Sequence, residues 1–203
     1  MLLNRPEGVR IQDGLGHRSS FAAAGGAGIS FVGQTAEAVA ASTTTDIELP
    51  SGLAQNDIVY IGWSRDTGTP GTNLIINSAD WIQIYVPAAQ GSPSAQVIRK
   101  VMGPSPDSVC NIENTAGAPV AFVVCAFRGM DTTTPEDGVA VVLATGTSGL
   151  PDGGSITPAT TGAWALVFGG LDDDNATDIV APTDYSNLSA IAAGGVAGTT
   201  SSP

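Results

Sequence analysis

Two apolar runs decide the fold of this chain: Asp57-Ile58-Val59-Tyr60-Ile61-Gly62-Trp63 and Val120-Ala121-Phe122-Val123-Val124-Cys125-Ala126-Phe127. Both are short, rich in β-branched and aromatic residues, and apolar at nearly every position. Because successive side chains of a strand point to opposite sides of its sheet, strands of this kind need cover on both faces. We therefore expect both runs to be central strands of an all-β domain.

The rest of the body, residues 29–203, continues as short β-rich runs between turn residues. Separators such as Pro50-Ser51-Gly52 and Gly103-Pro104-Ser105-Pro106 supply the backbone angles that turns require. The alternation Asp46-Ile47-Glu48-Leu49 predicts a strand with one wet face. This pattern predicts a single antiparallel β-sandwich over residues 29–203, a length that suits one such domain. The predicted strands are 29–33, 44–49, 57–64, 72–76, 81–86, 95–102, 108–113, 119–127, 139–145, 163–171 and 178–185.

Residues 1–28 differ in character and predict a flexible, extended N-terminal arm. They end in Ala22-Ala23-Ala24-Gly25-Gly26-Ala27-Gly28, which buries too little surface to offset its ordering entropy. The segment is either a disordered leader or an anchor whose one alternating piece, residues 9–11, adds to a neighbour's sheet edge. The candidate partner-binding residues of the arm are Arg5, Val9, Arg10, Ile11, His17 and Arg18.

The charge balance excludes several classes of partner. The formal net charge is −12, and because three arginines and two acidic residues leave the arm at +1, the remainder carries −13. An acidic body repels phosphate backbones, so we expect no nucleic-acid partner. No apolar stretch reaches the roughly 18 residues that a membrane span needs, and the N-terminus lacks a signal-peptide pattern. We expect a soluble, unexported protein without a membrane partner.

Residues that carry catalysis are scarce. His17 is the only histidine and lies in the arm, which argues against a Ser-His-Asp or Cys-His arrangement on a rigid scaffold. Two cysteines and one distant histidine do not make a plausible zinc site. There is no phosphate-binding loop of the Gly-x-x-x-x-Gly-Lys type, and the single lysine, Lys100, falls in a predicted strand. We expect a protein that is not an enzyme.

Two groups of carboxylates remain. Asp172-Asp173-Asp174-Asn175 and Asp178 follow a predicted strand, and their oxygens could supply part of a calcium site at Asp172, Asp174, Asn175 and Asp178. The alternative is a solvated acidic loop that ends a strand. Asp131, Glu136 and Asp137 allow the same two interpretations. No cofactor other than this possible calcium is expected.

The cysteines and tryptophans each allow two interpretations. Cys110 and Cys125 are placed on a hairpin that turns near Ala116-Gly117, either as buried free thiols or as a cross-strand disulfide. Trp63 and Trp164 are expected in the core. Trp81 follows polar residues and is a candidate platform for a sugar ring.

Several segments resemble a known family. Pro50-Ser51-Gly52-Leu53-Ala54-Gln55-Asn56-Asp57-Ile58-Val59 is similar to the P-x-G-L-x-x-G-D-x-V opening of a jelly-roll-like β-sandwich found in virion proteins of tailed bacteriophages. Asp80-Trp81-Ile82, Phe127–Asp137 and Thr157–Leu166 resemble later segments of that family in the same order. The likeness covers about residues 44–190 but not the arm, and Asn56 stands where the family has glycine. In Phe127–Asp137, Gly129 and Asp131 suit a sharp turn, and an Arg128–Asp131 pair facing a ligand is the functional alternative.

The resemblance implies a bacteriophage structural protein. We expect a decoration (cement) protein, made in the host cytoplasm, that stabilises the capsid by binding the outer head surface through its arm. The expected partners are the major capsid protein and copies of this chain, with a homotrimer favoured. The alternative is a receptor- or carbohydrate-binding module of a tail fibre or baseplate, which would use Trp81 and the acidic loop.

Overall fold

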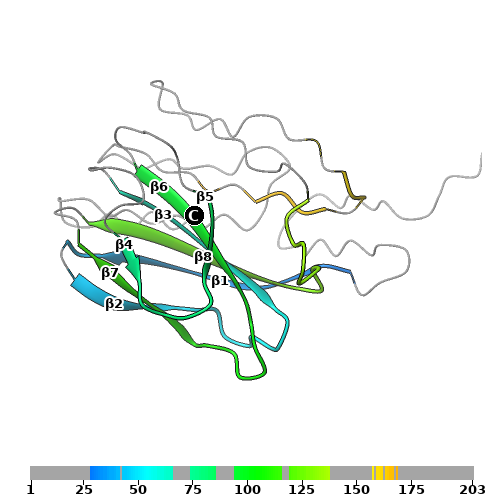
Figure 1. Cartoon of the computed structure of the whole chain (residues 1–203), viewed down its shortest axis with the longest axis horizontal. Helices are drawn as coiled ribbons and strands as arrows, with labels where there is room; N and C mark the ends of the chain where they lie inside the picture. The colour runs from blue at the N-terminus through cyan, green and yellow to red at the C-terminus, as the bar shows by residue number, and fades with distance from the viewer. Residues whose placement is uncertain are drawn as a thin grey trace, which may run out of the picture.

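The computed structural model describes residues 28–41, 43–65, 74–85, 94–115, 119–137, 157, 159–161, 163–166 and 168. Within this part of the chain there are eight strands and no helix (Figure 1). The prediction of an all-β domain is therefore confirmed. The strands are β1 (Ser30–Val39), β2 (Thr43–Glu48), β3 (Ile58–Arg65), β4 (Leu74–Ile76), β5 (Ile82–Tyr85), β6 (Ser94–Val101), β7 (Val109–Asn114) and β8 (Val120–Arg128).

The strands form two antiparallel sheets with a jelly-roll connection pattern. One sheet has the order β1-β8-β3-β6-β5 and the other the order β2-β7-β4. The pairs β1–β8, β2–β7 and β3–β6 are nested, as when a long antiparallel ribbon is wrapped around a barrel. A further nested pair would join β4 to β5, but β5 pairs with β6 instead. The sandwich is consequently a jelly roll in which β5 has moved to the larger sheet.

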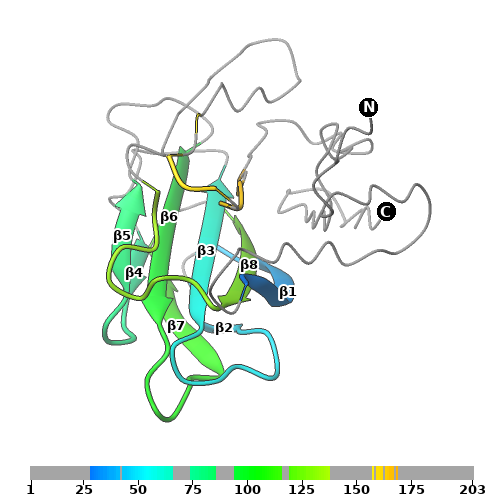
Figure 2. The ribbon, with the colours of Figure 1, turned by 90° about the vertical axis from the view of Figure 1, so that its right-hand side faces the viewer.

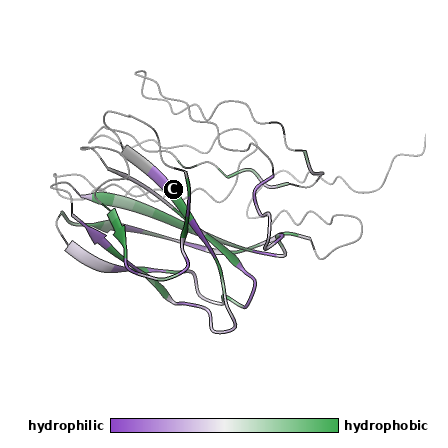
Figure 3. Cartoon of the chain, viewed as in Figure 1, coloured by the Kyte–Doolittle hydropathy of each residue, from purple (hydrophilic) through white to green (hydrophobic). Residues whose placement is uncertain are grey.

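The core lies between the two sheets. On β3, Val59, Ile61 and Trp63 point into it, and they meet residues of β2, β4 and β7 from the smaller sheet. Phe122 and Val124 of β8 point the same way and are fully buried. Figure 3 shows the apolar residues running along β8, whereas β2 is pale to hydrophilic. This contrast follows the predicted difference between a doubly covered strand and a strand with one wet face.

The outer face of the five-stranded sheet carries a second apolar cluster. Its buried members are Ile58 and Tyr60 of β3 and Cys125 and Phe127 of β8, the alternate positions to those in the core. Residues 163–168 contribute Trp164, Leu166 and Phe168 to this cluster. Figure 2 shows the yellow-orange segment lying over β6 and β3. Both faces of the two deciding strands are therefore covered, as the sequence predicted.

Two strand predictions need correction. β1 extends to Val39 rather than ending at residue 33, because pairing with β8 along its length overrides the low strand propensity of Ala36, Glu37 and Ala38. The described residues of the predicted strand 163–171 belong to no strand and instead cover the sheet face. The predicted strands 139–145 and 178–185 lie outside the described residues.

The hairpin predicted for the two cysteines is also wrong. β7, with Cys110, belongs to the three-stranded sheet, and β8, with Cys125, belongs to the five-stranded sheet. In a jelly roll successive strands cross from one sheet to the other, so sequence neighbours need not pair. Cys110 lies in the core and Cys125 in the outer cluster, and both are free thiols. The interpretation as buried thiols is confirmed.

Candidate functional site

An ion pair joins two of the segments that resemble the phage family. Asp57 directly precedes β3 and is fully buried, and Arg128 is the last residue of β8. Arg128 Nε donates to Asp57 Oδ1 at 2.8 Å and Arg128 Nη2 donates to Oδ2 at 2.7 Å. The geometry is bidentate, the strongest arrangement for a carboxylate with a guanidinium. The motif residues around position 57 and position 128 thus form one structural unit.

The turn before β3 supplies a further hydrogen-bond donor to the Asp57 carboxylate and an acceptor for Arg128. Ala54 N donates to Asp57 Oδ2 at 2.7 Å, and Gly52 O accepts from Arg128 Nη2 at 3.0 Å. Burial acts to raise the pKa of Asp57, but the hydrogen bonds from Arg128 and Ala54 and the charge of Arg128 hold the pKa below its usual value. The carboxylate therefore stays ionised inside the protein and fixes the turn.

Asn56 stands where the resembling pattern has glycine, and it adopts a backbone angle that favours glycine. Its φ is +69°, in the left-handed region that glycine adopts freely and that asparagine tolerates better than most residues. Its backbone N–H donates to Met102 O at 2.8 Å, which ties the turn to the end of β6. The position requires positive φ, and asparagine meets that requirement.

The alternative of an Arg128–Asp131 pair is wrong. Arg128 is used by Asp57, while Asp131 Oδ1 accepts from Thr133 N at 2.7 Å and from Thr134 N at 3.0 Å. The amides of Thr134 and Thr133 lower the pKa of Asp131. Gly129 has a φ of +84°. The segment is therefore a turn capped by its own aspartate, as the structural interpretation predicted.

Glu136 and Asp137 hold the segment after this turn against the outer face of the sheet. Glu136 Oε1 lies 2.7 Å from Arg99 Nε of β6 and accepts from Tyr60 Oη at 3.3 Å. Burial, and then the charge of Glu136, raise the pKa of Tyr60. Asp137 accepts from both the N–H and the hydroxyl of Thr160, each at 2.8 Å. These carboxylates are used in structural contacts and do not converge on a metal position.

Close aromatic contacts pack Trp164 and Phe168 against the outer face of the five-stranded sheet. Gly62 of β3 leaves a gap into which the ring of Phe168 fits, so that a Cβ at position 62 would lie 2.1 Å from Phe168 Cδ1. Trp164 packs edge-to-face on Phe127 with ring centroids 5.4 Å apart. Phe31 of β1 meets the same Phe127 ring at 5.6 Å. Trp164 and Phe168 are thus fitted to this face by shape.

The other tryptophans occupy different environments. Trp63 is buried in the core, and its Nε1 donates to Gln96 Oε1 at 2.8 Å, which confirms the predicted core role. Trp81 is half-buried and packs against the core cluster. Its Nε1 is buried without a hydrogen-bond partner among the described residues. A glycan contact at Trp81 remains a prediction.

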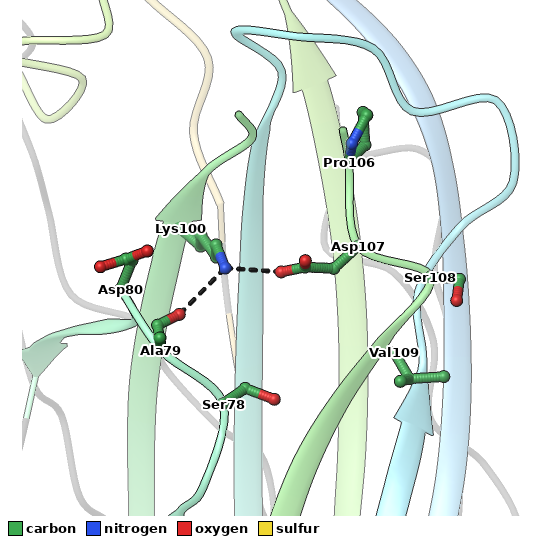
Figure 4. Close-up of a pocket in the computed structure, with 8 residues that line it drawn as sticks. All are labelled: Ser78, Ala79, Asp80, Lys100, Pro106, Asp107, Ser108 and Val109. Atoms are coloured by element: carbon green, nitrogen blue, oxygen red, sulfur yellow. Dashed lines mark hydrogen bonds and ion pairs between the residues drawn. The ribbon is translucent and has the colours of Figure 1, made fainter. Parts of the chain in front are cut away.

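A hollow in the described surface lies at one end of the sandwich, between the β4–β5 turn and the β6–β7 connection. It has a volume of about 570 Å³ and is lined by Ser78, Ala79, Asp80, Lys100, Pro106, Asp107, Ser108 and Val109. Lys100 Nζ bridges the two walls by donating to Asp107 Oδ2 at 2.5 Å and to Ala79 O at 2.9 Å (Figure 4). Sequence reasoning missed this arrangement, although a lone lysine within a strand was a signal for it.

The outer face of the three-stranded sheet is acidic. Asp46, Glu48 and Glu113 lie on it, and its three strands contain no lysine or arginine. Asn111 Nδ2 donates to Asp46 Oδ1 at 2.6 Å, and Asn77 Nδ2 donates to Asn111 Oδ1 at 2.9 Å. This polar row matches the predicted wet face of the strand that contains Asp46.

Most of the sequence-predicted site residues lie outside the part of the chain that the structure describes. These are the arm residues Arg5, Val9, Arg10, Ile11, His17 and Arg18, and the acidic-loop residues Asp172, Asp174, Asn175 and Asp178. Within the described ranges, no three His, Cys, Asp or Glu side chains come together as a metal site. Nor does any helix in those ranges have the length and apolar character needed to cross a membrane.

Comparisons with known proteins add no relative. No protein-family model matches the chain, and neither a curated protein nor a solved structure shows a match.

Proposed function

We propose that this chain is a structural protein of a tailed-bacteriophage particle. In this role it is a decoration protein that binds the outer surface of the head through residues 1–28 and associates with further copies of itself, with a trimer favoured. The observation that carries the proposal is the Asp57–Arg128 ion pair. It joins two of the four segments that resemble the phage domain, which supports treating these two as one motif and not as two chance similarities.

The chemistry of the described surface is compatible with a role in assembly. The buried Asp57, the half-buried Glu136 and the more peripheral Asp131 and Asp137 are all engaged by protein partners. Thr35 Oγ1 of β1 also donates to Glu48 O of β2 at 2.6 Å and so links the two sheets at one side. Such a scaffold holds its shape and leaves the arm as the element that contacts the particle.

The arm is the proposed attachment site because its charge differs in sign from that of the body. An arm at +1 beside a body at −13 can approach an acidic particle surface that repels the sandwich. Attachment of several arms in one oligomer would strengthen binding by raising the effective concentration of each arm at the surface.

A sedimentation assay with particles that lack this protein tests the proposal. The full chain should co-sediment with the particles, and replacing Arg5, Arg10 and Arg18 by serine should remove most of the bound protein. The matched control changes the acidic residues of the same arm, as Glu7→Gln with Asp13→Asn, and should bind at least as well as the wild type. Undiminished binding of the arginine variant would show that the positive charge of the arm does not anchor it to the particle.

A further inference from the structure

The hollow around Lys100 has a preformed arrangement of polar groups. Lys100 comes from the end of β6, and its side chain is only 11% exposed. The bonds to Asp107 and to Ala79 O fix the ammonium between two chain segments (Figure 4). A ligand that contacts this ammonium would not have to order a free lysine side chain, which removes a usual cost of binding.

Donors and acceptors remain unused at this position. An ammonium group has three N–H donors, and the described residues use two of those of Lys100. The carboxylate of Asp107 accepts through Oδ2 and keeps Oδ1 as a further acceptor. The hollow thus presents a fixed donor and a fixed acceptor on neighbouring groups, with the hydroxyl of Ser108 on its rim.

The charge of the lining selects the class of ligand. Lys100 is offset by Asp107, and the exposed Asp80 leaves the hollow with one net negative charge, which disfavours anions. The lysine disfavours a metal cation. Ala79, Pro106 and Val109 add apolar surface, and the volume of about 570 Å³ falls within the usual range for small-molecule sites.

We propose that the hollow formed by Ser78–Asp80, Lys100 and Pro106–Val109 is a binding site for a neutral saccharide. One sugar hydroxyl accepts from Lys100 Nζ, its neighbour donates to Asp107 Oδ1, and the C–H face of the ring lies against Pro106 and Val109. The site is independent of attachment to the particle, because it lies in the sandwich and not in the arm.

The test is titration of the full chain with methyl glycosides of glucose, galactose, mannose and N-acetylglucosamine, followed by two-dimensional NMR of the labelled protein. At least one glycoside should shift the amide signals of residues 78–80 and 106–109. Asp107→Asn should weaken its binding by about tenfold or more, since the charged acceptor is replaced by a neutral amide. Ala79→Trp, which fills the hollow and keeps every polar group, should abolish binding.

Glu113→Gln is the matched control, because it removes the same charge at a position of β7 that does not line the hollow and should leave the affinity unchanged. Ala79→Trp also guards against a folding defect in Asp107→Asn, since position 79 is an exposed turn residue. The proposal is overturned if no glycoside shifts these signals, if Ala79→Trp binds as well as the wild type, or if inorganic phosphate or calcium binds there more tightly than every glycoside.

Discussion

Removing Asp57 and removing Arg128 should lower the stability of the fold by different amounts. In Asp57→Ala the guanidinium left behind is 50% exposed, and the freed Ala54 N–H lies in an exposed turn, so water can replace the lost bonds. We expect a loss of about 2 kcal/mol in the free energy of unfolding. In Arg128→Met the carboxylate of Asp57 stays fully buried with Ala54 N–H as its remaining charge-stabilising partner. This variant should be clearly less stable than Asp57→Ala at pH 8.

The pH dependence follows from the pKa of Asp57. In the wild type this pKa is lowered, so the pair stabilises the fold above the unfolded-state pKa and its contribution is lost as the pH falls through the folded-state pKa. Without Arg128, burial raises the pKa instead, and the variant loses stability as the pH rises. The loss in the free energy of unfolding caused by Arg128→Met should therefore be smaller at pH 5.5 than at pH 8. The loss caused by Asp57→Ala should be the same at both pH values.

Urea denaturation of the three proteins at both pH values measures these differences, with unchanged m-values as the check that the unfolding transitions are comparable. Equal losses for the two variants at pH 8, or a pH-independent deficit for Arg128→Met, would refute the inference that Asp57 is a buried, ionised group held by Arg128.

Other contacts give separate predictions. Gly62→Ala should lower the free energy of unfolding by about 1–3 kcal/mol, because the added Cβ meets the ring of Phe168, and this loss should be smaller in a Phe168→Ala background. Additive losses for the two changes in a denaturation double-mutant cycle would contradict the contact. Asn56→Ala should lower stability by about 1 kcal/mol and Asn56→Gly should not, as thermal unfolding would measure; equal losses would argue against the positive φ. Burial raises the pKa of Cys110 and Cys125 to about 12, so both thiols should resist a thiol reagent at pH 8 until the protein unfolds; rapid native labelling of either would contradict its burial.

Local patterns predicted the strands of this fold well. The apolar runs that contain Ile61 and Phe122 are covered on both faces, and the alternation at Asp46 and Glu48 marks a strand with one wet face. Turn chemistry was also readable, since Gly129 and Asp131 act as the residue types suggested. These features depend on neighbours in sequence, which is why the sequence alone could show them.

Pairing between distant residues could not be read in the same way. Asp57 and Arg128 belong to separate motifs that lie 71 positions apart in the sequence, and only the fold brings the two side chains together. For the same reason the crossover from β7 to β8 was mistaken for a hairpin, because adjacency along the chain is the usual guide to strand pairing. The packing of the Phe168 ring against Gly62 likewise joins residues that are far apart in sequence, so no local pattern could predict it.

We propose that this chain is a component of the virion head. Quantitative mass spectrometry of purified phage particles tests it most directly, by comparing the copy number of this chain with that of the major capsid protein. For a head decoration protein we expect a copy number of the same order as that of the capsid protein. Absence from the particle, or a copy number matching that of the tail-tip proteins, would contradict a role as a head decoration protein.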